Sequence, residues 1–146
     1  CAAGTGRFLE VMARVLDCGL PELSALAHKA TRELSISSVC TVFAESEVIS
    51  RLAAGESREN VARGAHRAVT KRVAGMCGRT GFSVPVVMTG GVSLNSDLVW
   101  CLSEELGVPV VPAPHAQCAG AVGAALAAWE KACSGRRGEP ATQNRR

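Results

Sequence analysis

The stretch from residue 84 to residue 111 constrains the fold more than any other part of this sequence. Val84–Thr89 is a short, continuous apolar run, which is typical of a buried parallel strand, and Gly90–Gly91 follows at its carboxyl end. The apolar spacing predicts a helix over Ser96–Leu106 and a second strand over Val108–Val111. Because parallel neighbours need a crossover connection, we expect a right-handed strand–helix–strand unit. The chain is therefore predicted to be an α/β protein.

The remainder of the chain is predicted to be mostly helical. Two strands do not form a stable sheet by themselves, so we expect another segment to supply the rest of the sheet. Together with Cys1 in the place of a starting Met, this predicts the carboxyl-terminal piece of a longer protein. The expected organisation is a partial domain over residues 1–133 and a disordered tail over residues 134–146. Helices are predicted from Thr5 to about Gly19, from Pro21 to Ala30, from Thr41 to Gly55, from Ser57 to about Gly78, and from Gln117 to Lys131.

Composition excludes several classes of protein. The net charge is only +3, and no basic face or alternation of arginine with aromatic residues suggests nucleic-acid binding. No apolar run approaches the roughly 20 residues that a membrane helix needs. The seven cysteines are odd in number and contain no CxxC spacing, so a disulfide framework is not favoured. We therefore expect a cytoplasmic protein that binds neither nucleic acid nor membrane.

Two cysteines are candidates for metal binding. Cys1 and Cys40 each stand just before a predicted helix, where free N–H groups and the helix dipole favour the thiolate. Thiolates bind iron–sulfur clusters, and a four-iron cluster is usually coordinated by four of them. One chain with two such cysteines would have to share the cluster with a second copy across a twofold axis. Their spacing is no metal signature, so two inert buried thiols remain the alternative.

The other cysteines are predicted to be structural, and each histidine is predicted to be either a surface or a structural residue. The histidines lack the spacing of zinc ligands, and a reduced cysteine usually packs as a small apolar residue. These residues are Cys18, Cys77, Cys101, Cys118, Cys133, His28, His66 and His115.

The paired glycines after the first strand form a second candidate site. Gly90 and Gly91 allow a sharp turn and let a ligand lie against bare backbone. Open α/β sheets bind ligands at this position, beyond the carboxyl ends of the strands. An ordinary strand-to-helix turn is the alternative. The run Ala2–Gly6 has the composition of a phosphate loop but matches neither GxxxxGK[ST] nor GxGxxG.

Four segments resemble one known ATPase family, which comprises the activators of 2-hydroxyacyl-CoA dehydratases and the ATPase subunits of benzoyl-CoA reductase. CAAGTGRFLE at residues 1–10 and ISSVCTVFAESEVIS at residues 36–50 resemble its two cluster-ligand segments. VMTGGVSLN at residues 87–95 resembles its adenosine-binding turn, and AGAVGAA at residues 119–125 resembles its closing helix. The resemblance runs from residue 1 to about residue 132.

The resemblance implies an actin-like (ribonuclease H-like) ATPase fold, of which this chain would be the carboxyl-terminal lobe. It implies a homodimer, or a pair with a close paralogue, that holds one [4Fe-4S] cluster between the subunits. It also implies binding of ATP or ADP with Mg²⁺. Carried over by position, the cluster ligands are Cys1 and Cys40, the turn beside the cluster is Ala3, Gly4, Thr5 and Gly6, and the nucleotide contacts are Gly90, Gly91, Val92, Asn95 and Gln117.

The implied function is ATP-dependent transfer of a low-potential electron. Reduced ferredoxin or flavodoxin would be the donor, and a reductase or dehydratase of CoA thioesters would be the acceptor. The hydrolytic residues are unknown and are expected in an amino-terminal part outside this chain, so the chain alone is expected to be inactive. Pro114–Gln117 resembles benzoyl-CoA reductase subunits slightly more than dehydratase activators. A cluster-free phosphotransferase of the sugar-kinase type and an inactive dimerising fragment remain alternatives.

Overall fold

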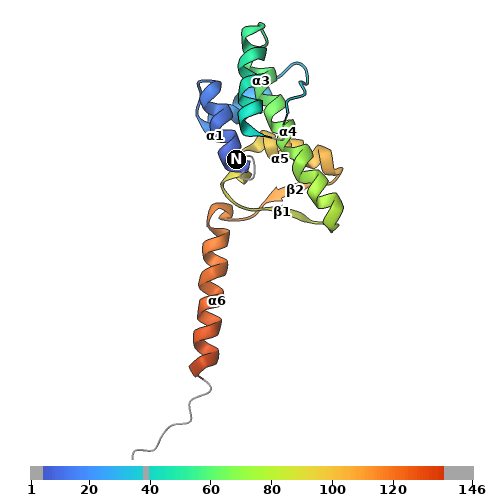
Figure 1. The fold of residues 1–146 in the computed structure, drawn as a ribbon. Coiled ribbons are helices and arrows are strands. Elements are labelled where there is room, and N and C mark those ends of the chain that lie inside the picture. Colours follow the sequence, from blue (N-terminus) through green and yellow to red (C-terminus); the bar gives the residue numbers. More distant parts are fainter. Residues whose placement is uncertain (1–4, 38–39, 137–146) are drawn as a thin grey trace, which may run out of the picture.

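The computed structural model describes residues 5–37 and 40–136, which form a helical body beside a small sheet (Figure 1). The predicted α/β organisation is confirmed, and the helix predicted over Ser96–Leu106 has those bounds. In chain order the elements are α1 (Thr5–Val15), α2 (Leu20–His28), α3 (Thr41–Ala53), α4 (Arg58–Thr80), β1 (Val86–Met88), the 3₁₀ helix η1 (Gly91–Leu94), α5 (Ser96–Leu106), β2 (Val110–Pro112), the 3₁₀ helix η2 (Ala116–Cys118) and α6 (Ala119–Arg136).

Local sequence signals fix the ends of these helices. Pro21 stands in the first turn of α2, where its missing N–H has no helical partner to lose. Ser57 caps α4, because its side chain accepts the N–H of Asn60. Gly107 ends α5 in the left-handed conformation with φ of +66°, which a residue without a Cβ adopts readily.

The core is formed by one face of each of the first five α-helices. Helix α4 lies at its centre and packs against both α2 and α5. Gly64 permits one close approach, since a Cβ there would lie 2.9 Å from Cδ1 of Ile36 and 3.0 Å from the carbonyl oxygen of Leu34. The largest apolar side chains that are fully buried are Phe8, Met12, Leu16, Leu23, Leu98, Val48, Val61 and Val69.

The two strands pair in parallel, with Val86 opposite Val110 and Met88 opposite Pro112, as the crossover predicted. Met88 packs against the core, but Val87 is 52% exposed and Val111 is 46% exposed. The prediction of a buried strand is therefore wrong for the structure as described, because no described element covers the other face of the sheet.

Helix α6 projects away from the body (Figure 1). It starts two residues later than predicted, after η2, and continues to Arg136, which lies beyond the predicted start of the tail at residue 134. Val122, Leu126 and Trp129 are each more than half exposed on it. Within residues 5–37 and 40–136, no helix combines the length and apolarity that crossing a bilayer requires.

Candidate functional site

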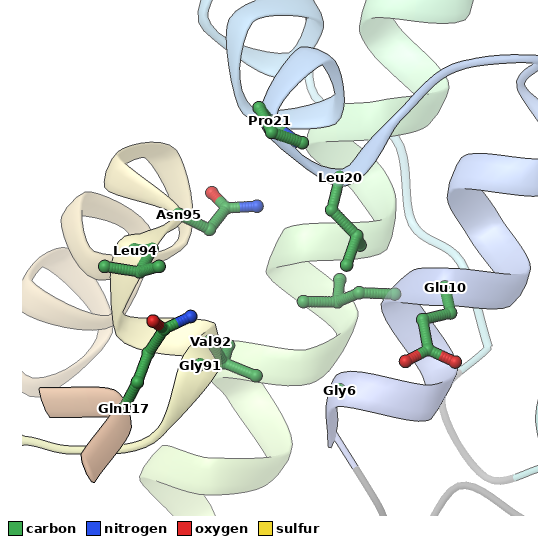
Figure 2. A pocket seen from close by; sticks show the side chains of 10 residues that line it. Gly6, Glu10, Leu20, Pro21, Gly91, Val92, Leu94, Asn95 and Gln117 are labelled. Atoms are coloured by element: carbon green, nitrogen blue, oxygen red, sulfur yellow. The ribbon is translucent and has the colours of Figure 1, made fainter.

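A cavity of about 440 Å³ lies where α1, α2 and the turn after β1 meet (Figure 2). Helix α1 forms one wall, and η1 with the start of α5 forms the opposite wall. The lining is mostly apolar, with one carboxylate and two carboxamides among its described side chains. The lining residues are Gly6, Leu9, Glu10, Leu20, Pro21, Gly91, Val92, Leu94, Asn95 and Gln117.

The glycine turn brings the predicted nucleotide residues together. Gly90 has φ of +87°, and its N–H donates to the carbonyl oxygen of Ala116 over 2.8 Å. This bond ties the turn to η2, so that Gln117 reaches the cavity beside Gly91. One cavity wall therefore combines residues from two separate stretches of sequence, namely Gly91, Val92 and Asn95 from the turn and Gln117 from η2. Gly90 does not line the cavity, but its hydrogen bond to Ala116 holds the turn in place.

Asn95 is held by two hydrogen bonds at this wall. As the N-cap of α5, its Oδ1 accepts the N–H of Leu98 over 2.9 Å. Its Nδ2 lies 3.0 Å from Nε2 of His66, which is fully buried on α4. The carboxamide is only slightly exposed, but it still lines the cavity.

A buried aspartate stands behind His66. Oδ2 of Asp97 lies 2.6 Å from Nδ1 of His66, and Oδ1 of Asp97 lies 2.8 Å from the Arg63 guanidinium and 3.3 Å from Nδ1 of His28. Burial alone raises the pKa of Asp97, but the hydrogen bond from His66 and the nearby positive charges outweigh burial and lower it. The guanidinium of Arg63 also stacks 4.6 Å above the ring of Trp100. Asp97 is therefore a buried carboxylate whose polar partners come from two helices, Arg63 and His66 from α4 and His28 from α2.

Cys40 occupies a different position, at the amino end of α3. It is the N-cap, with extended φ and ψ of −139° and 132°. The sequence predicts Thr41 as the cap of this helix, but Thr41 is its first helical residue. The backbone N–H groups of Phe43 and Val42 lower the pKa of the Cys40 thiol. The side chains of Phe43 and Val42 are exposed. The expected effect of the helix terminus on this thiol is therefore present.

The segment that precedes α1 is described only in part. Cys1, Ala3 and Gly4 lie outside the described residues. Thr5 and Gly6, which the resemblance places in the turn beside the cluster, are the first two residues of α1, in agreement with the helix predicted from Thr5. A Cβ on Gly6 would lie 3.6 Å from the side chain of Val92 across the cavity. Cys40 thus remains the one predicted ligand that can be placed.

The other cysteines do not share one environment. Cys101 is buried, and burial raises the pKa of its thiol to about 12. Cys118 is exposed, so the prediction that it packs in the core is wrong. In the part of the chain that the structure describes, no three His, Cys, Asp or Glu side chains converge on a possible metal position.

Sequence comparison places the chain among known ATPases. Residues 1–128 match the BadF/BadG/BcrA/BcrD ATPase family. The activator of lactoyl-CoA dehydratase from Anaerotignum propionicum is 53% identical over 132 residues, which are 90% of this chain and 51% of that protein. A benzoyl-CoA reductase polypeptide from Thauera aromatica is 36% identical over 132 residues, which are 86% of this chain and 47% of that protein.

A solved structure shares the fold. The activator of 2-hydroxyisocaproyl-CoA dehydratase from Clostridium difficile, with bound ADPNP, superposes with a TM-score of 0.83 at 40% identity. The match covers 92% of this chain and 50% of that chain, so this chain spans about half the length of the relatives it matches. The expected actin-like fold is confirmed by this superposition.

Proposed function

The chain belongs to the BadF/BadG/BcrA/BcrD ATPase family, and from this premise we propose that it is part of an ATP-dependent electron-transfer activator. The activator binds ATP or ADP with Mg²⁺ in the cavity and holds a [4Fe-4S] cluster between two subunits. It passes a low-potential electron, received from ferredoxin or flavodoxin, to an enzyme that acts on CoA thioesters. We place this function in the cytoplasm.

One observation carries the proposal: helix α1 links the cavity to the cysteine on α3. Gly6, Leu9 and Glu10 of α1 line the cavity. Helix α1 also packs against α3, whose N-cap is Cys40 (Figure 1). A ligand in the cavity would therefore touch a helix that packs against α3, the helix that begins after Cys40, and coupling requires a physical connection of this kind.

The cavity has the size and chemistry for a nucleoside. Its volume of about 440 Å³ lies within the usual range for small-molecule sites. Leu9, Leu20 and Val92 offer apolar walls for a base, and the backbone at Gly91 permits close approach. The carboxylate of Glu10 is a suitable acceptor for ribose hydroxyls.

The chemistry of Cys40 suits an iron ligand. A thiol with a lowered pKa at an exposed helix terminus supplies the thiolate that iron–sulfur clusters use. Cys1 is the proposed second ligand, and two chains together provide four thiolates. A bound cluster would supply one-electron transfer, while this chain holds Cys40 and presents the apolar side chains of Val42 and Phe43 beside it.

Coupling between the nucleotide and the electron requires two arrangements of the dimer. ATP shifts their equilibrium only if it binds one of them more tightly than the other. Since α1 lines the cavity and supports α3, a change in the position of α1 is the proposed route.

The partner that we propose is a 2-hydroxyacyl-CoA dehydratase. The lactoyl-CoA dehydratase activator is 53% identical to this chain, and the benzoyl-CoA reductase polypeptide is 36% identical. These identities point away from benzoyl-CoA reductase, which Pro114–Gln117 slightly favoured in the sequence.

Iron analysis of the full-length protein, made without oxygen, tests the proposal. We expect a brown dimer with about four iron atoms. Cys40→Ala should abolish the iron, whereas Cys118→Ala, at an exposed cysteine outside the proposed ligand set, should retain it. A colourless dimer whose ATP turnover depends on a sugar and ignores Cys40→Ala would instead support a cluster-free phosphotransferase.

A further inference from the structure

We propose that the buried pair His66 and Asp97 positions Asn95 for the nucleotide, by fixing which way the Asn95 carboxamide faces in the cavity wall. This inference rests on the proposed nucleotide site. Neither His66 nor Asp97 lines the cavity, so the pair acts through Asn95 and is a positioning unit.

The orientation follows from one donor whose role is certain. The backbone N–H of Leu98 can only donate, so the atom of Asn95 that faces it over 2.9 Å must be the oxygen Oδ1. The NH₂ group of Asn95 then faces Nε2 of His66 over 3.0 Å, and Nε2 must be an acceptor. The ring proton of neutral His66 therefore stands on Nδ1, where it donates to Asp97 over 2.6 Å.

Asp97 is what selects this form of the histidine. Its carboxylate accepts from Nδ1 on one oxygen and faces the Arg63 guanidinium on the other. Both His66 and Asp97 have fully buried side chains, so bulk water does not compete for these bonds. With Asp97 in place, a flipped Asn95 would set its NH₂ against the N–H of Leu98 and its oxygen against the lone pair of Nε2.

This arrangement decides what the ligand meets. One hydrogen of the Asn95 NH₂ group is used by His66 and one lone pair of Oδ1 by Leu98. The second hydrogen and the second lone pair remain, in fixed positions, for polar atoms of the adenosine part of the nucleotide. A wrongly oriented carboxamide would exchange donor for acceptor at both positions.

Asp97→Asn in the full-length protein reverses the arrangement with little change of shape. Arg63 is always a donor, so the oxygen of the new carboxamide must face it and the NH₂ group must face Nδ1 of His66. The His66 proton then moves to Nε2 and opposes the Asn95 NH₂ group. We expect long-range ¹H–¹⁵N spectra to show the proton on Nδ1 in the unmodified protein and on Nε2 in the variant.

Calorimetric titration with MgADP measures the consequence. We expect Asp97→Asn to weaken binding about tenfold, as for a lost hydrogen bond at a buried site. His28→Gln is the matched control, because His28 contacts the same carboxylate from α2 but neither lines the cavity nor contacts Asn95. It should leave the dissociation constant within about twofold, which corresponds to a surface substitution.

Asn95→Asp is a second variant that keeps the helix cap. Its carboxylate still accepts the N–H of Leu98 but cannot donate to His66, so MgADP should again bind about tenfold more weakly. Reversal of the His66 tautomer with unchanged affinity would overturn the positioning role, as would a proton on Nε2 in the unmodified protein. Unchanged affinity in Asn95→Asp would overturn it as well, even if Asp97→Asn does not fold.

Failure of the proposed function gives a separate result. In that case the unmodified protein would not bind MgADP, and this inference would lose its ligand, although the spectra would still report the His66 tautomer. Binding by the unmodified protein that both variants preserve would contradict the positioning role and leave the nucleotide site standing.

Discussion

Helices α3 and α5 begin in opposite surroundings. At the start of α5, the cap Asn95 is buried and its carboxamide bonds to Leu98 and His66. At the start of α3, the cap Cys40 makes no side-chain capping bond, and two nearby side chains, Val42 and Phe43, are 65% and 69% exposed. The cap of the first region bonds to neighbouring groups inside the protein, whereas the second region presents a thiol and two apolar side chains at the surface. The contrast indicates that the start of α5 holds a polar side chain in a fixed orientation, whereas the start of α3 presents a thiol that can react or bind a metal.

The sharpest test of this contrast compares two thiols. Burial raises the pKa of Cys101 to about 12, so at pH 7 only about one in 10⁵ of these thiols is ionised. The pKa of Cys40 is lowered, so its thiolate persists to lower pH than that of an ordinary cysteine. After removal of iron, we expect iodoacetamide to label Cys40 more than about a thousandfold faster than Cys101. Peptide mass spectrometry of timed samples measures both rates, and equal rates would break the comparison.

Removal of the buried carboxylate should cause the largest loss of stability. Asp97→Ala leaves His66 and Arg63 without their partner, and we expect it to cost about 3–5 kcal/mol in the free energy of unfolding at pH 7. Urea unfolding of the full-length protein measures the loss. Glu104→Ala, at an exposed carboxylate on the same helix, should change the free energy by less than about 0.5 kcal/mol.

The stabilisation that Asp97 provides has a defined pH dependence. Because folding lowers the pKa of Asp97, its stabilisation is fully present above the ordinary pKa of an aspartate. It is lost as the pH falls through the lowered value of the folded state. The unfolding free energies of the unmodified protein and of Asp97→Ala should therefore converge in acid, and a constant difference would contradict the assignment.

Two valines on α3 allow its buried face to be compared with its exposed face. Val48 is fully buried, whereas Val42 is 65% exposed. We expect Val48→Ala to cost about 2 kcal/mol, from lost burial and the space left behind. Val42→Ala should change the free energy of unfolding by less than about 0.5 kcal/mol in urea titrations. A large loss at Val42 would show that this face is covered in the full-length protein.

The smallest effect concerns helix caps. Ser57→Ala removes the hydrogen bond to the N–H of Asn60 and should cost about 1 kcal/mol. Cys40→Ala removes no side-chain capping bond, so thermal unfolding of the iron-free protein should show a loss of only a few tenths of a kcal/mol. Equal losses of stability in Ser57→Ala and Cys40→Ala would mean that the Cys40 side chain stabilises the helix, as a cap does.

Much of the fold could be predicted because the signals are local. Apolar periodicity and caps such as Ser57 indicated the helices, and paired glycines indicated the turn at Gly90. The nucleotide turn also follows a local pattern, although Gln117 was assigned through a resemblance. The exposed face of the sheet at Val87 was not predicted, because an apolar run alone does not show what covers it.

The rest of the site could not be predicted because it depends on contacts between elements. Glu10 and Leu20 reach the cavity from helices that precede the turn by many residues. His66 and Asp97 meet only through the packing of α4 against α5. One signal was present: His66 lies on the apolar face of α4 between Ala65 and Val69, and a polar side chain there needs a buried partner.

The stacking of Arg63 on Trp100 connects a fluorescent side chain to the buried carboxylate of Asp97. The guanidinium lies 4.6 Å from the centre of the indole ring and also contacts Asp97 over 2.8 Å. A positive charge over the face of an indole perturbs its π electrons, and its displacement changes the colour of the fluorescence. The emission of Trp100 should therefore follow the state of the Asp97 carboxylate without any added label. The second tryptophan, Trp129, lies on α6, and Trp129→Phe removes its contribution, which matters because Trp100 is 42% exposed and Trp129 is 54% exposed.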